Sequence, residues 1–182
     1  MIKKSLIAIS LIVVLLTACQ TKPTETPATS DEAFELYLVA DEEMRGPDLK
    51  DSKLSELPLV QTPLISTDDV VNYMWDHHVL NITEEAYQKI LFIYSAGVPT
   101  DGLPFVVMSD GERIYAGAFW PAASSLSFDG VVIPQPFDPA NMPLFIALGY
   151  PTPEAFTGED PRDNPRLQNA LEREDLLYEE ED

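Results

Sequence analysis

The chain has one cysteine, two histidines and far fewer basic than acidic residues. No cysteine follows Cys19. A monomer therefore has no disulfide bond, and residues 20–182 offer no thiolate for catalysis or for a metal site. The 11 lysines and arginines stand against 31 aspartates and glutamates, which gives a formal net charge of −20 at pH 7. Such a chain repels phosphate backbones and anionic lipid headgroups, so nucleic acid is a poor partner and membrane attachment needs acyl chains.

Several catalytic patterns are also absent. The chain has no glycine-rich phosphate-binding loop, and Ser124 and Ser125 lie outside any nucleophile-elbow pattern. The adjacent histidines His77 and His78 would point to opposite faces of a strand, so they do not converge on one metal ion. Carboxylates are too numerous for a catalytic pair to be chosen. We therefore assign no catalytic residue, no metal site and no cofactor. The sequence does not decide whether the protein is an enzyme, but it favours a protein without enzymatic activity.

The first apolar run ends shortly before the only cysteine. Lys3 and Lys4 precede the run Leu6–Leu16, which is too short to span a bilayer. The residues at its end, Leu16-Thr17-Ala18-Cys19, resemble the lipobox of a bacterial lipoprotein signal peptide. This resemblance implies lipidation of Cys19, with palmitate among the acyl chains. The alternative is an ordinary secretory signal that has a cysteine at the cleavage site.

Cleavage before Cys19 would remove residues 1–18 and leave 182 − 18 = 164 residues, the size of one domain with tails. The formal charge would then change from −20 to −22, because two lysines leave with the signal. We assign residues 19–32 to the lipidated cysteine and a tether rich in threonine and proline. Residues 33–158 form the predicted globular domain, and residues 159–182 a C-terminal helix with an acidic tail.

Two helices have clear start signals. Thr83 precedes two glutamates and an apolar pattern at helical spacing, which predicts a helix that ends at Gly97. Asn164 and Pro165 are a typical cap and first residue, and they predict a second helix whose apolar stripe reaches Leu177. Helices of this kind need a sheet or other helices on which to bury their apolar faces.

The strand pattern is clearest around residues 105–119. An Asp-Gly turn at residues 109–112 separates two apolar runs, which predicts a β-hairpin. Ser66 and Asp69 stand at capping-box spacing and predict a short helix over residues 67–72. Further strands are predicted at residues 34–39, 73–75, 79–82, 131–133 and 144–148. The order of elements predicts an α+β fold in a single domain, a mostly antiparallel sheet with helices packed on one face.

Four segments resemble the periplasmic P1 head region of the SecD/SecDF protein-translocation family. They are residues 63–70 (PLISTDDV), 79–86 (VLNITEEA), 105–115 (FVVMSDGERIY) and 127–133 (SFDGVVI). In the family such segments form a strand with a short helix, a strand leading into a helix, a hairpin and a final strand. The resemblance covers about residues 63–133. It implies this fold and a surface that holds extended polypeptide, but not proton-driven translocation, since no transmembrane helix follows the signal.

The most unusual stretch after the signal is residues 117–130 (GAFWPAASSLSFDG). Phe119 and Trp120 end a predicted strand, and Ser124 and Ser125 follow among small residues. Because aromatic side chains often anchor binding surfaces, we predict a binding loop with these four residues. The alternative is that both aromatic residues complete the core and the serines form a surface loop.

Together, these features favour a lipid-anchored protein on the extracytoplasmic side of the bacterial cell membrane, or on the outer membrane where the cell has one. We expect a non-catalytic module that binds a protein or peptide partner at the cell envelope. Two alternatives stay open. One is an envelope hydrolase that uses acidic side chains, and the other is a lipoprotein that captures a solute.

Overall fold

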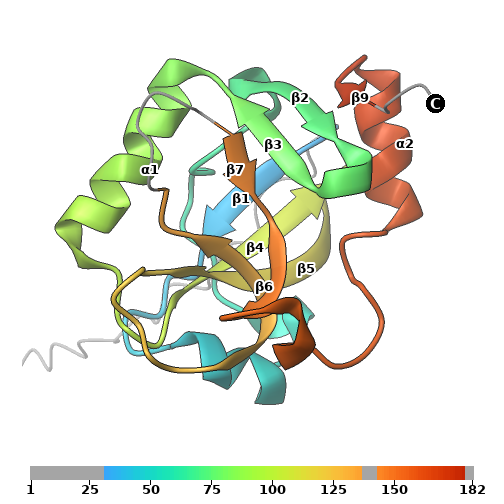
Figure 1. The fold of residues 1–182 in the computed structure, drawn as a ribbon. Helices are drawn as coiled ribbons and strands as arrows, with labels where there is room; N and C mark the ends of the chain where they lie inside the picture. The colour runs from blue at the N-terminus through green and yellow to red at the C-terminus, as the bar shows by residue number, and fades with distance from the viewer. Residues whose placement is uncertain (1–30, 137–142, 179–182) are drawn as a thin grey trace, which may run out of the picture.

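Two β-sheets enclose the main core of the protein (Figure 1). The computed structural model describes residues 31–136 and 143–178. One sheet has the strand order β1-β4-β5-β6-β8 and the other the order β7-β3-β2-β9. The single α+β domain predicted from the sequence is confirmed, but its strands divide between two sheets instead of forming one. The signal, Cys19 and the tail residues 179–182 lie outside the described residues.

The five-stranded sheet contains the predicted hairpin. Asp110 and Gly111 form its turn with φ angles of 49° and 70°, in the left-handed region that Asp-Gly pairs tolerate. On its other side, β5 pairs with β6 in parallel, and only from Gly117 onward. The strands of this sheet are β1 (Glu35–Leu38), β4 (Leu103–Ser109), β5 (Glu112–Trp120), β6 (Phe128–Pro134) and β8 (Ala147–Tyr150).

The four-stranded sheet contains β2 (Val70–Met74), β3 (Val79–Ile82), β7 (Pro143–Phe145) and β9 (Leu177–Tyr178). The strand predicted at residues 144–148 is two strands, since β7 and β8 belong to different sheets. Buried Ile146 separates them, and its N–H donates to the carbonyl of His78 at 3.0 Å. Leu177, predicted in the second helix, instead pairs with Tyr73 as part of β9.

Both predicted helix starts are confirmed. The side chain of Thr83 accepts a hydrogen bond from the N–H of Ala86, and that of Asn164 from the N–H of Arg166. The helix predicted at residues 67–72 is one 3₁₀ turn that gives way to β2 at Val70. The helices are α1 (Glu84–Gly97) and α2 (Pro165–Arg173), with 3₁₀ turns η1 (Gly46–Asp51), η2 (Leu54–Glu56), η3 (Thr67–Asp69), η4 (Trp75–His77) and η5 (Pro153–Ala155).

The five-stranded sheet is covered on both faces. Its inner face joins residues of the second sheet, α1 and α2 in the main core. Its outer face carries two smaller apolar clusters, one beneath η1 and η2 and one around Trp120. Adjacent residues of β4 and β5 are therefore buried although they point in opposite directions. Helices α1 and α2 lie at opposite sides of the molecule (Figure 1), and no helix in the described ranges is long and apolar enough to cross a membrane.

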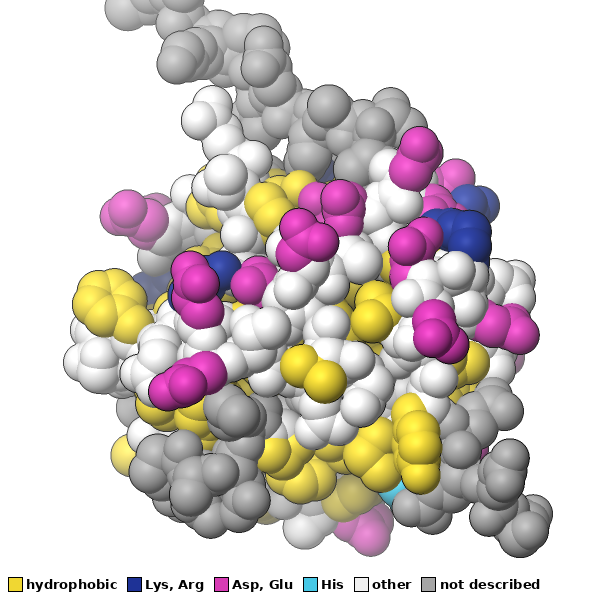
Figure 2. Space-filling model, turned by 90° about the horizontal axis from the view of Figure 1, so that it is seen from above, with side chains coloured by type: hydrophobic (Ala, Val, Ile, Leu, Met, Phe, Trp, Pro, Cys, Tyr) yellow, Lys and Arg dark blue, Asp and Glu magenta, His cyan; other side chains and the backbone are white. Residues whose placement is uncertain are grey.

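The surface carries the surplus of negative charge that the composition requires. Figure 2 shows acidic side chains spread over the face seen from above, with few basic ones among them. Seven of the eight lysines and arginines in the described ranges pair with a carboxylate, and the other, Arg113, donates to the carbonyls of Leu54 and Leu57. The exposed charge that remains available to a partner is therefore negative.

Candidate functional site

The aromatic residues of the predicted binding loop are buried. Phe119 and Trp120 are each 0% exposed. Phe119 packs on Phe105 in the main core, with ring centroids 5.2 Å apart, and Trp120 stacks on Phe128 on the other face, at 4.9 Å. The prediction that they form a binding face is therefore corrected. They are core residues, as the alternative interpretation holds, because both faces of β5 are covered.

The two serines of the same loop differ in their surroundings. The hydroxyl of Ser124 is almost buried, donates to the carbonyl of Thr100 at 2.6 Å and accepts from the N–H of Leu126 at 3.2 Å. It fixes the conformation of the loop. Ser125 is exposed, and its role in binding stays a prediction.

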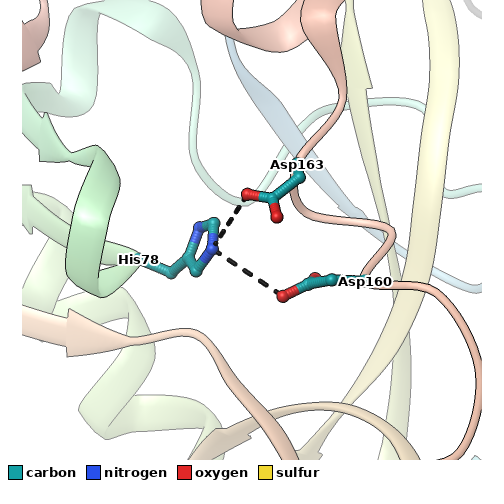
Figure 3. Close-up of side chains that lie close together, drawn as sticks. All are labelled: His78, Asp160 and Asp163. Atoms are coloured by element: carbon teal, nitrogen blue, oxygen red, sulfur yellow. Dashed lines mark ion pairs between the residues drawn. The ribbon is translucent and has the colours of Figure 1, made fainter.

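Three side chains that were not predicted to form a site lie close together: His78, Asp160 and Asp163 (Figure 3). His78 follows η4 in the turn between β2 and β3, and both aspartates come from the loop between η5 and α2. Nε2 of His78 lies 3.4 Å from Oδ1 of Asp163 and 3.9 Å from Oδ2 of Asp160. We call these three residues the His–Asp cluster.

A left-handed turn points His78 into this cluster. Its φ and ψ angles are both 48°, and its N–H donates to the carbonyl of Trp75 at 3.2 Å. Histidine is among the non-glycine residues that adopt this conformation more often than most. The turn gives the two histidines different surroundings: the side chain of His78 is only 9% exposed, whereas His77 is exposed.

Arg162 holds Asp160 in place. Its Nε donates to both carboxylate oxygens of Asp160, and its Nη1 donates to the carbonyl of Ile146. Burial opposes ionisation of Asp160, but the hydrogen bonds and charge of Arg162 outweigh it and hold the pKa of this carboxyl below its usual value. A general acid in a hydrolase needs a raised pKa, so Asp160 does not fit that role.

Tyr73 orients the imidazole of His78. Its hydroxyl lies 3.0 Å from Nδ1 of His78. The ring of Trp75 packs edge to face against the imidazole, with ring centroids 5.7 Å apart. Burial, reinforced by the charge of Arg162, lowers the pKa of His78 although the neighbouring aspartates oppose this shift. The imidazole is therefore neutral at neutral pH and has one nitrogen directed at the carboxylates.

Tyr115 of β5 belongs to the main core. It is 3% exposed, and its hydroxyl has no hydrogen-bond partner within the described part of the chain. Burial raises the pKa of this hydroxyl; the charges of Tyr73 and Asp160 add to the shift and that of Arg162 opposes it. A buried hydroxyl without a hydrogen-bond partner lowers the stability of the fold by about 1–3 kcal/mol.

A groove of about 440 Å³ lies where β5 and β6 diverge. Pairing of these strands starts at Gly117, so no described strand pairs with this side of residues 112–116. Lys50 and Asp129 lie at the groove 3.8 Å apart, and Pro161 contributes to its lining. The apolar side chains of the groove come from Leu49, Leu54, Leu57, Ile114 and Phe128.

No protein-family model, curated protein or solved structure matches this chain. The resemblance of residues 63–133 to the SecD/SecDF head region therefore stays a prediction from the sequence. The groove and the His–Asp cluster are two candidate binding sites among the described residues.

Proposed function

We propose that the protein is a lipid-anchored, non-catalytic module on the extracytoplasmic side of the bacterial cell membrane that binds an extended polypeptide segment in the groove beside β5. The observation that carries this proposal is the unpaired edge of β5, of which residues 114–116 line a groove with several apolar side chains. Membrane attachment rests on the lipobox pattern at Cys19, and two or three acyl chains would make such an anchor effectively permanent.

A strand edge is a template for another strand. Proteins usually protect such edges by a covering element, a bulge or a charged side chain. Here η1 and η2 contribute residues to the groove beside β5. An added strand would gain main-chain hydrogen bonds from β5, while the apolar walls would receive every second side chain.

The charge of the domain selects among peptides. Carboxylates outnumber basic groups, and Lys50 at the groove is already paired with Asp129. An acidic peptide would therefore be repelled, whereas a segment that alternates apolar and basic side chains would be attracted. The expected partner is therefore an extended segment with alternating apolar and basic side chains.

The test uses the full chain in detergent micelles and a labelled peptide that alternates valine and lysine. Fluorescence anisotropy should show saturable binding. A second peptide carries the same side chains but is N-methylated on alternate amides, so that one edge cannot pair. We expect it to bind at least about tenfold more weakly, because strand pairing depends on main-chain donors. Equal binding of both peptides would rule out pairing with β5.

Two matched substitutions locate the surface. Leu49→Ser changes the groove wall, and Leu126→Ser changes a leucine that is 46% exposed and lies outside the groove. We expect the first to weaken binding of the unmethylated peptide and the second to leave it unchanged. Thermal melts of both variants check that each is folded. Equal effects of the two substitutions on peptide binding would rule out the groove as the binding surface.

A further inference from the structure

The potential ligand atoms of the His–Asp cluster lie close enough together to hold one metal ion. In a tetrahedral zinc site with bonds of about 2.0–2.2 Å, neighbouring ligand atoms lie about 3.3–3.6 Å apart. Nε2 of His78 and Oδ1 of Asp163 are 3.4 Å apart, and Oδ2 of Asp160 is 3.9 Å from the same nitrogen. All three ligand atoms lie within 4.8 Å of one another.

Two of the ligands are held by a second layer of hydrogen bonds. The hydroxyl of Tyr73 meets Nδ1 of His78, which leaves Nε2 directed at the carboxylates. Arg162 fixes the carboxylate of Asp160. Metal-binding histidines and carboxylates are commonly oriented in this way, and the orienting partners contribute to affinity.

The cluster lies at the edge of the core. The side chain of His78 is only 9% exposed, whereas that of Asp163 is 61% exposed, so an ion could reach the cluster from solvent.

The balance of charge also favours a cation. Two carboxylates face His78, and Arg162 neutralises only one of them. One imidazole with two carboxylates is a ligand set that suits Zn²⁺ and similar transition ions better than Ca²⁺, which takes six to eight oxygen ligands.

We infer that His78, Asp160 and Asp163 bind one divalent transition-metal ion, with Zn²⁺ as the best match. Three protein ligands leave one tetrahedral position for water or for a group of a bound partner. None of the three ligands lines the peptide groove, so failure of this inference would leave the proposed function standing.

The experiment measures Zn²⁺ uptake by isothermal titration calorimetry. It uses the full chain with the background substitution Cys19→Ser, which removes the only thiol. We expect one ion per chain with micromolar affinity, and a Co²⁺ complex whose visible absorption has the intensity of tetrahedral coordination. Absence of saturable uptake at millimolar Zn²⁺ would overturn the inference.

Asp163→Asn is the decisive variant, because this exposed side chain contributes little to folding. We expect it to weaken Zn²⁺ binding by about tenfold or more. Asp76→Asn removes the same charge close to His78 without removing a ligand, and His77→Asn removes the neighbouring imidazole. Both controls should change the affinity by less than about threefold. An equal loss with Asp76→Asn would mean diffuse attraction instead of coordination.

Discussion

Arg162 and Asp160 are joined by four hydrogen bonds, one from the backbone N–H of Arg162, two from Nε and one from Nη2. The remaining guanidinium nitrogen donates to the carbonyl of Ile146, the residue that divides β7 from β8. A single side chain therefore ties the loop before α2 to the junction of the two sheets. Its 12% exposure protects these bonds from water.

Arg162→Met should lower the free energy of unfolding by about 2–4 kcal/mol, because it leaves a largely buried carboxylate and a carbonyl without their donors. Arg166→Met is the matched control. Arg166 pairs with Glu112 at 3.1 Å, but both side chains are largely exposed, so the expected loss is below about 1 kcal/mol. Urea denaturation measures both values. Similar losses would show that the Arg162 network does not stabilise the junction.

Trp120→Ala should act on stability instead of on partner binding. The indole is fully buried and stacks on Phe128, so its removal leaves a cavity and should cost about 3–5 kcal/mol. Phe92→Ala, at a phenylalanine that is 71% exposed on α1, should cost less than about 1 kcal/mol. The same urea experiment compares them. A stable Trp120→Ala variant would contradict the core assignment.

The elements that could be predicted are those whose signals are local. The Asp110-Gly111 turn defines the β4–β5 hairpin, and the Thr83 and Asn164 caps define the starts of α1 and α2 within a few residues. The division of residues 143–150 into β7 and β8 at Ile146 has no such local signal. It depends on a hydrogen bond from the N–H of Ile146 to the carbonyl of His78, which is distant in the sequence.

The His–Asp cluster could not be predicted for the same reason. His78 and Asp160 are separated by 160 − 78 = 82 residues, and Asp160 and Asp163 look like part of an ordinary polar loop in so acidic a chain. Burial of Trp120 is also non-local. Gly46 and Gly102 pack so closely on its ring that a Cβ atom would come within 3.0 Å and 2.7 Å of it.

Gly102→Ala tests that close packing. Gly102 has a φ of 88°, which costs a residue with a side chain about 1–2 kcal/mol. The clash with Trp120 should add about 1–3 kcal/mol. Gly158→Ala is the control, since its φ of 114° is comparably unfavourable but nothing lies within 4 Å of the added Cβ. Equal destabilisation by the two substitutions would show that Trp120 is free to move.

Tyr94 should make stability fall at alkaline pH. Burial raises the pKa of its phenol, whose hydroxyl donates to the carbonyl of Ile133 at 2.6 Å. Above about pH 10 the unfolded chain loses this proton while the folded chain keeps it, so stability falls by up to about 1.4 kcal/mol per pH unit. Tyr94→Phe should show a shallower fall above pH 10 and the same slope as the parent below about pH 9. Identical slopes throughout would contradict the shift.

Cys19→Ala tests the lipid anchor directly. Only a thiol at this position can accept the lipid, so cells fed labelled palmitate should label the parent protein and not the variant. Ala18→Gly keeps a small residue before the cysteine and should preserve the label. Mass spectrometry of the processed parent separates the two interpretations of the signal. Cleavage before an acylated Cys19 supports the lipoprotein, because a secretory signal would release a chain without acyl groups.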